Sequence, residues 1–373
     1  MKIQAAVLRA ANSPLVIEQL ETDELRENEV LVKLAGTGVC HTDLGLIAGP
    51  AEGQTPIVLG HEGAGTVVEV GRGVTELTVG DSVVLSYAHC GVCDNCSSGL
   101  PQHCREFNAR NLSGARADGS TPLGRNGEPV LGAWFGQSSW ADHCVVEVQN
   151  AIKVDDDIPL ELLGPLGCGI QTGAGAVLNT LRPRRGSSIA VFAVGAVGLA
   201  AILGAVVAGC SPIIAVDIDD SHLQKALELG ATHIVNSRDV DAAQAVRDIT
   251  NGAGVHYSVD CIGFPAVVRS ALECLQTPGV CATVGFQGIP NEITIDQGLL
   301  LFGKSLVGVV EGDAVPSEFI PRMISLFKQG QFPFDKLIDT YAFADINAAV
   351  NAAHHGAVAK AVVVFDSEHS AHA

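Results

Sequence analysis

The stretch Ile189-Ala-Val-Phe-Ala-Val194-Gly195-Ala-Val-Gly198 decides the fold of the second half of the chain, together with Ile213-Ile-Ala-Val-Asp217. An apolar run that meets a glycine turn and then a helical stretch is the start of a β-α-β unit with parallel strands. Strand patterns recur at 256–260 and 280–284, with helical patterns at 221–229, 242–250 and 265–275 between strands. From about Ser187 onward, the sequence therefore predicts a doubly wound parallel sheet.

The turn at Gly195 and Gly198 predicts a dinucleotide site. Glycines there let the backbone approach a pyrophosphate at the positive end of the helix dipole, although Ala193 replaces the usual first glycine of G-x-G-x-x-G. Asp217, at the end of the next strand, suits the ribose hydroxyls and repels a 2′-phosphate. The pattern favours NAD over NADP. The alternative is a purely structural strand–turn–helix with an exposed aspartate.

The first 160 residues show a different sequence pattern, in which short β-type runs are interrupted by Gly and Pro. Examples are Val30–Ala35, Gly65–Val70 and Asp81–Ser86. Such runs predict a mainly antiparallel, barrel-like domain with long loops. The length of 373 residues suits two domains of ordinary size.

Four cysteines in fifteen residues predict a closed metal site. Cys90, Cys93, Cys96 and Cys104 form a C-x2-C-x2-C-x7-C run, which can wrap one tetrahedral Zn²⁺ and leave no open position. Ferredoxins also begin C-x2-C-x2-C but continue with x3-C-P. Structural zinc is therefore favoured over an iron–sulfur cluster.

Composition limits the partners and the compartment. The net charge of −19 argues against nucleic acid. Eleven cysteines, an odd number without a regular framework, fit a reducing compartment, and the N-terminus lacks a signal-peptide pattern. The uncharged run 189–208 contains three glycines and begins as a strand, so we interpret it as buried rather than membrane-spanning. The expectation is a cytoplasmic protein without a membrane partner.

Three further ligand-type residues lie in turns: Cys40, His61 and Cys168. Two thiolates and an imidazole make a Cys₂His set, which leaves a fourth zinc position open for chemistry. Taken singly, each is more often a core cysteine or a surface histidine, and their spacing alone does not bring them together.

The chain resembles the zinc-dependent alcohol dehydrogenases of the medium-chain dehydrogenase/reductase superfamily over nearly its whole length. The matching pieces are Gly60-His61-Glu62-Gly63, Cys40 with Thr42 and Asp43, the four-cysteine run, and the turn ending at Gly198 with Asp217. Stretches 164–179 and 135–139 are similar to the aryl (benzyl) alcohol dehydrogenases in particular.

The resemblance implies the architecture and the site. It implies a GroES-like catalytic domain at 1–170 and 311–373, with the zinc lobe near 90–104, and an NAD-binding Rossmann domain at 171–310. It implies catalytic zinc on Cys40, His61 and Cys168 with Glu62 close by, and two zinc ions per chain. Asp43 would orient His61, and Thr42 would bond the substrate oxygen and pass its proton on. The residues implied for the cofactor are Thr172 and Val197 near the nicotinamide, and His41 and Lys360 at the pyrophosphate. A homodimer or homotetramer is the family habit.

Two departures and an open substrate question accompany the resemblance. Gly45 stands where many members carry the histidine that ends the proton relay, and Ala193 alters the glycine turn. By comparison with the family, Ala51, Ser86 and Phe286 fall at the substrate pocket, whereas the aromatic residues 134, 135 and 140 could equally be packing residues. We expect oxidation of primary aromatic or allylic alcohols to aldehydes, with aliphatic primary alcohols or thiol-adduct formaldehyde as alternatives. A zinc-free quinone or enone reductase would lack the cysteine ligands. A non-catalytic NAD-binding protein would be expected to lose one of Cys40, His61 or Cys168, and this chain keeps all three.

Overall fold

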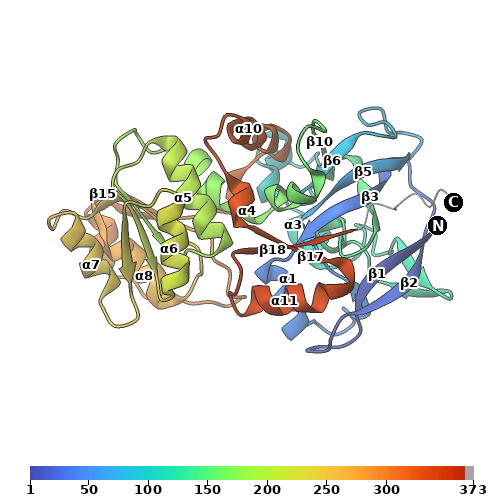
Figure 1. Ribbon diagram of the computed structural model, residues 1–373, viewed down its shortest axis with the longest axis horizontal. Coiled ribbons are helices and arrows are strands. Elements are labelled where there is room, and N and C mark those ends of the chain that lie inside the picture. The colour runs from blue at the N-terminus through green and yellow to red at the C-terminus, as the bar shows by residue number, and fades with distance from the viewer. Residues whose placement is uncertain (366–373) are drawn as a thin grey trace. The chain divides into compact units, whose positions relative to one another are not determined.

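A computed structural model describes residues 1–365, which form two compact units (Figure 1). Of the described residues, the first unit contains 1–168, 315–321 and 338–365, and the second contains 169–314 and 322–337. Residues 169–170 and 311–314, predicted for the catalytic domain, belong to the second unit, and so does the segment 322–337 that was predicted with them. The physical reason is that Phe332 and Phe334 are fully buried and the short helix Phe334–Leu337 contacts α5 (Ala196–Ala208). Residues 366–373 of the predicted catalytic domain lie outside the described part.

The first unit is built on two mainly antiparallel sheets. One has the strand order β4-β1-β2-β7-β8, and the other β10-β6-β5-β3-β18-β17 with β9 also paired to β3. The strands are β1 (Lys2–Leu8), β2 (Val16–Thr22), β3 (Glu29–Gly38), β4 (Ile57–Val58), β5 (Gly63–Val70), β6 (Ser82–Leu85), β7 (Leu123–Arg125), β8 (Glu128–Val130), β9 (His143–Glu147), β10 (Ala151–Lys153), β17 (Ile338–Ala342) and β18 (Lys360–Val364). Its helices are α1 (His41–Ala48), α2 (Asp94–Ser97), α3 (Phe107–Leu112) and α11 (Ile346–His354), while α10 (Pro316–Lys328) is divided between the units.

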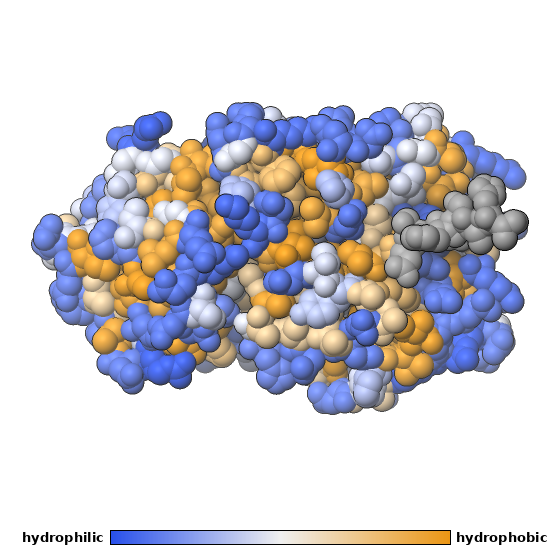
Figure 2. All heavy atoms as spheres, viewed as in Figure 1, coloured by the Kyte–Doolittle hydropathy of each residue, from blue (hydrophilic) through white to orange (hydrophobic). Residues whose placement is uncertain are grey.

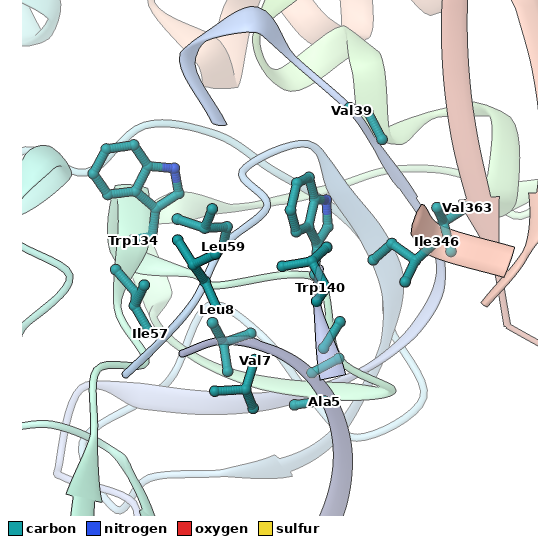
Figure 3. Close-up of a cluster of buried hydrophobic side chains, with 14 of the residues drawn as sticks. Ala5, Val7, Leu8, Val39, Ile57, Leu59, Trp134, Trp140, Ile346 and Val363 are labelled. Carbon is teal, nitrogen blue, oxygen red and sulfur yellow. The ribbon is translucent and has the colours of Figure 1, made fainter. Parts of the chain in front are cut away.

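A buried cluster beside β1 and α11 forms one core of this unit (Figure 3). Exposed and buried residues alternate in β1 only from Lys2 to Ala5, and the strand is buried throughout from Ala5 to Leu8, so all its apolar residues belong to the cluster. Two large indole rings, Trp134 and Trp140, share the cluster with Leu8 and Leu59 and are 3% and 0% exposed. This core therefore borders directly on the loops that carry the chemistry.

The second unit contains a six-stranded parallel sheet of order β13-β12-β11-β14-β15-β16. Its strands are β11 (Ile189–Phe192), β12 (Ile213–Asp217), β13 (His233–Asn236), β14 (Val255–Asp260), β15 (Leu275–Thr283) and β16 (Lys304–Gly308). Its helices are α4 (Gly169–Gly175), α5, α6 (Asp220–Glu228), α7 (Ala242–Ile249), α8 (Pro265–Glu273) and α9 (Gln297–Leu301). The predicted doubly wound parallel sheet is confirmed, and the strand order reverses at β11, where such sheets bind their ligands.

The surface is mixed in character. On the face seen in Figure 2, hydrophilic and hydrophobic residues are intermingled on both units. Within residues 1–365, no helix has the length and apolar character needed to cross a membrane. The uncharged stretch 189–208 forms β11 and α5, whose residues are largely buried in the second unit.

Candidate active site and cofactor site

Four potential metal ligands meet inside the first unit. Cys40 is the N-cap of α1, His61 and Glu62 precede β5, and Cys168 follows a short 3₁₀-helix. One ligand atom from each of these four residues lies within 4.8 Å of the other three. The structure thus brings together residues that the sequence separates by more than a hundred positions.

The donor set fits zinc. His61 is 1% exposed, and its Nε2 atom has no hydrogen-bond partner among residues 1–365, a costly state for a buried nitrogen unless it binds something. The thiol of Cys40 is held well below its ordinary pKa by its hydrogen bond with Cys168 and by the nearby His61 and Lys360, although burial opposes this. Two thiols, one of them readily ionised, and an unpartnered imidazole nitrogen are ligands that zinc prefers.

The Asp43 carboxylate organises the ligands from behind. It is fully buried, and Oδ1 accepts hydrogen bonds from His61 Nδ1 at 2.9 Å, from the Gly60 backbone at 3.2 Å and from Trp134 Nε1 at 2.9 Å. Oδ2 accepts the Cys40 backbone N–H at 3.1 Å. Burial alone would lower the pKa of His61, but Asp43 and Cys40 raise it well above its ordinary value. With Nδ1 bonded to Asp43, Nε2 is the ring nitrogen left for a metal.

Glu62 forms a buried ion pair with Lys360. The Lys360 ammonium lies 2.8 Å from both oxygens of Glu62 and 3.1 Å from the Val39 carbonyl, and it is 3% exposed. Burial raises the pKa of Glu62, and the lysine opposes that rise. A Cβ at Gly38 would lie 1.9 Å from Glu62 Oε2, so glycine there makes room for the pair. The role of Lys360 at a pyrophosphate stays a prediction, because here its ammonium contacts Glu62.

The four-cysteine loop forms a second ligand group, which we call the cysteine lobe. Cys90, Cys93, Cys96 and Cys104 again place one sulfur each within 4.8 Å of the others, and none is in a disulfide. Backbone N–H groups of Cys90 and Glu106 point at Cys104 Sγ, and that of Cys93 points at Cys90 Sγ. Four convergent sulfurs with N–H donors fit a closed structural zinc site.

The glycine turn of the second unit has the geometry expected for a dinucleotide site. Ala193 adopts a left-handed backbone with φ 65°, which an alanine tolerates less readily than the usual glycine. A Cβ at Gly198 would lie 2.2 Å from the Ala193 carbonyl, whereas Gly195 faces open space. A Cβ at Gly173 would lie 1.9 Å from the Val197 carbonyl, so α4, which carries Thr172, packs closely on the start of α5. The turn, Thr172 and Val197 therefore lie together.

Asp217 stands at the carboxyl end of β12, beside that turn. Its Oδ2 accepts the Val194 backbone N–H at 2.7 Å and lies 3.6 Å from His222 Nδ1. Oδ1 accepts the N–H groups of Ile218 and Asp219. Burial would raise the pKa of Asp217, but His222 and the backbone donors lower it below its ordinary value, so the carboxylate is ionised near neutral pH.

The remaining predicted site residues differ in their contacts and in their exposure to solvent. Thr42 Oγ1 lies 3.8 Å from Cys40 Sγ, and Ser86 Oγ donates to the Gly167 carbonyl beside Cys168. His41 and Ala51 are exposed in the first unit, and Phe286 is 63% exposed in the second. A Cβ at Gly45 would meet nothing within 4 Å, so packing does not exclude a larger side chain there.

Sequence reasoning missed a second carboxylate at the same sheet edge. Asp260 ends β14, is fully buried, and accepts hydrogen bonds from the Ile262 and Gly263 backbones and from Thr283 Oγ1. The adjacent Cys261 N–H donates to Phe192 at the end of β11. Asp260 therefore fixes the turn that follows β14, next to the end of β11. An aspartate ending an apolar strand, as Asp217 does, was the available signal.

Comparison with known proteins agrees with this arrangement. The class of metal-assisted dehydrogenases is defined by one unit with a Cys–His–Cys ligand group and another with a parallel sheet of the type that binds dinucleotides. Residues 26–156 match the family model described as alcohol dehydrogenase GroES-like domain, and residues 196–329 match that described as zinc-binding dehydrogenase. The chain belongs to the zinc-binding alcohol dehydrogenases of the medium-chain dehydrogenase/reductase superfamily, as the resemblance predicted.

Individual relatives are similar over the full length. The chain is 45% identical to a geraniol dehydrogenase of Castellaniella defragrans, covering 97% of each chain. It is 37% identical to an S-(hydroxymethyl)glutathione dehydrogenase of Synechocystis sp., covering 97% of this chain and all of the relative. A crystal structure of benzyl alcohol dehydrogenase from Acinetobacter calcoaceticus superposes with TM-score 0.94 at 42% identity, covering 98% of this chain and 100% of that one. An alcohol dehydrogenase zinc-binding domain protein from Burkholderia ambifaria gives 0.95 at 46%, covering 98% and 99%.

Proposed function

We propose that this alcohol dehydrogenase uses NAD and zinc to oxidise primary aromatic or allylic alcohols to aldehydes. The observation that carries the proposal is the buried group Cys40, His61 and Cys168, in which one imidazole nitrogen lacks a protein partner. We assign one zinc ion to this group and a second, structural ion to the cysteine lobe. We also propose a cytosolic location, because a reducing compartment suits a chain in which none of the eleven cysteines forms a disulfide.

The chain's own residues account for the steps around the reacting centre. Zinc supplies a Lewis acid that lowers the pKa of an alcohol, and NAD⁺ supplies the hydride acceptor. Thr42, beside Cys40, would accept the hydrogen bond of the substrate hydroxyl and take up its proton while giving its own hydroxyl proton towards the nicotinamide ribose of the cofactor and on to solvent. Asp43 fixes the ring of His61. Asp217 offers its carboxylate to the ribose hydroxyls of the cofactor.

The substrate class is supported by the relatives rather than by a defined pocket. Geraniol and benzyl alcohol, which name two of them, both carry a hydroxymethyl group next to an unsaturated carbon. The S-(hydroxymethyl)glutathione relative represents the main alternative. A glutathione adduct carries two carboxylates, which call for basic residues near the pocket mouth, and few such residues stand near the predicted pocket positions in the sequence.

A side-by-side substrate comparison tests this assignment. With zinc-loaded protein and NAD⁺, we expect kcat/KM for benzyl alcohol or geraniol to exceed that for 1-hexanol by about tenfold, which corresponds to roughly 1.4 kcal/mol of transition-state binding. S-(hydroxymethyl)glutathione should be poorer than either. A preference for hexanol, or for the glutathione adduct, would retain the alcohol dehydrogenase chemistry and reject the aromatic or allylic class.

We also propose that the chain forms a homodimer or homotetramer through the edge strand β16. Only one side of β16 is paired, to β15, within the described chain, and an unpaired strand edge is a site for pairing with a second copy. Leu301 and Phe302, just before this strand, are 68% and 74% exposed. Apolar side chains of that size beside an open edge suit a self-complementary contact.

Sedimentation of purified protein tests the assembly. We expect a mass of two or four times 38.5 kDa, and we expect Phe302→Asp to shift the protein towards monomer because a charge would be buried at the contact. Val79→Asp, at a residue 62% exposed in the first unit, is the matched control. A parent that sediments as a monomer would reject the interface.

A further inference from the structure

A buried segment behind the proposed catalytic metal site follows the ligand loop closely. This segment, Trp134–Trp140, we call the backing segment, and the ligand loop is Val58–Gly63. Ser139 and Trp140 donate backbone hydrogen bonds to Gly60 and Leu59 at 2.9 Å each. A Cβ at Gly60 would lie 2.3 Å from the Trp140 ring and 2.7 Å from the Trp140 backbone nitrogen, so glycine at this position permits the close approach of the two segments.

Buried side chains of the backing segment extend this contact. Gln137, which is fully buried, donates to the His61 carbonyl at 2.9 Å and accepts the Gly63 N–H at 3.1 Å. Ser138 Oγ donates to the Val58 carbonyl at 2.7 Å. The ligand loop therefore has its backbone polar groups satisfied on both sides of His61, a condition that fixes a loop in one conformation.

Aromatic rings complete the contact at the side chain itself. The Phe135 ring stacks on the His61 imidazole with centroids 4.3 Å apart and planes 20° apart. Trp134 packs edge-on against Phe135 and donates its Nε1–H to the Asp43 oxygen that also holds His61 Nδ1. Trp134 thus helps to hold Asp43, which in turn holds His61, and Phe135 packs directly on the face of the imidazole ring.

The backbone of the segment is strained where it makes these contacts. Phe135 and Ser138 both have φ near 50°, in the left-handed region that bulky residues avoid. Strained residues of this kind persist only where the surroundings determine them and are concentrated at functional sites. Here the strain coincides with the residue whose ring covers His61.

We propose that the backing segment is a positioning element for His61, and that Phe135 and Trp134 thereby determine how firmly the catalytic site retains its metal. The inference rests on the proposed function, since it needs zinc at Cys40, His61 and Cys168. Neither aromatic residue contacts the metal position as a ligand. They act through the orientation of the imidazole, as groups behind a ligand do.

Zinc release provides a readout that does not depend on activity. Zinc-loaded protein is mixed with an excess of a chromophoric chelator, and the release of the two ions is followed in time. We expect Phe135→Leu, which keeps an apolar side chain but removes the ring face stacked on His61, to release one zinc per chain about tenfold faster than the parent and to leave the release of the other unchanged. Trp134→Phe, which keeps an aromatic ring but removes the indole N–H and part of the ring volume, should accelerate the release of the same ion. In cobalt(II)-loaded protein, both variants should alter the visible ligand-field bands.

Controls separate positioning from a general loss of stability and from a wrong metal assignment. Phe334→Leu removes a fully buried ring from the second unit and should release both ions at the parental rate. Cys40→Ser should abolish the release phase that Phe135→Leu accelerates, and if it does not, the metal assignment itself fails. Parental release rates and unchanged cobalt spectra in both Phe135→Leu and Trp134→Phe would overturn the inference while leaving the metal assignment intact. If Phe135→Leu does not fold, Trp134→Phe decides the question alone.

Discussion

Replacing Cys40 by serine should reduce kcat for alcohol oxidation by about a thousandfold or more while NADH binding stays nearly unchanged. A Lewis acid contributes several kcal/mol to such a step, and each 1.36 kcal/mol is a factor of ten in rate. Serine is a poor zinc ligand at neutral pH, so zinc content should fall from two ions per chain to one. The glycine turn and Asp217 belong to the other unit, so the cofactor site should survive.

Three measurements on the same preparation check this result: turnover, zinc content by elemental analysis, and NADH affinity by fluorescence titration. Cys144→Ala is the matched control, because Cys144 is a buried cysteine of the same unit that belongs to neither ligand group. Full activity in Cys40→Ser, or a parental zinc content of one or none, would refute the assignment. Loss of NADH binding together with turnover would instead contradict the division of labour between the units.

Asp217→Ala should lower kcat/KM with NAD⁺ by about tenfold to a hundredfold and raise it with NADP⁺. Hydrogen bonds to a charged group contribute about 1.5–3 kcal/mol, and these would be lost for the ribose of NAD⁺. The repulsion between a carboxylate and a 2′-phosphate would be removed at the same time. The ratio of kcat/KM values for the two cofactors measures the change, and an unchanged ratio would show that another residue sets the preference.

The surroundings of Asp217 sharpen this test. Arg238 Nη2 donates to the carbonyl of Ile218, the residue that follows Asp217, so a guanidinium already stands near the expected position of a 2′-phosphate. We expect Asp217→Ala/Arg238→Gln to lose most of the NADP⁺ gain while keeping the NAD⁺ loss. Asp217→Asn, which keeps the shape and removes the charge, should lie between the parent and the alanine variant.

The fold could be predicted largely from local patterns. The run from Ile189 to Asp217 combines a buried strand, a glycine turn and a buried helix, and each part independently favours the same unit. The assignment of 322–337 failed because α10 is amphipathic and shows no local signal of the unit to which each end belongs. Burial of Phe332 and Phe334, which decides it, is a long-range property.

The site was predictable only in part for a related reason. The cysteine lobe can be predicted from local spacing because its four ligands lie within fifteen residues. Cys40, His61 and Cys168 could be grouped only through the family resemblance. The Glu62–Lys360 pair joins residues 298 positions apart. The stacking of Phe135 on His61 depends on a left-handed backbone at a phenylalanine, which local preference argues against.

The short distances between sulfurs in the cysteine lobe also affect how the purified enzyme responds to oxidation once its metal is lost. Cys93 Sγ lies 3.5 Å from Cys96 Sγ, and Cys90 Sγ lies 3.9 Å from Cys96 Sγ. A disulfide needs its sulfurs about 2 Å apart, so only a small movement separates the metal-binding arrangement from a cross-linked one. If the metal is removed by a chelator and the protein is then exposed to air, oxygen would oxidise two of these thiols to a disulfide. Zinc added afterwards cannot reverse that bond, although it can reverse the loss of metal alone. Reductant must precede zinc in any attempt to restore such material.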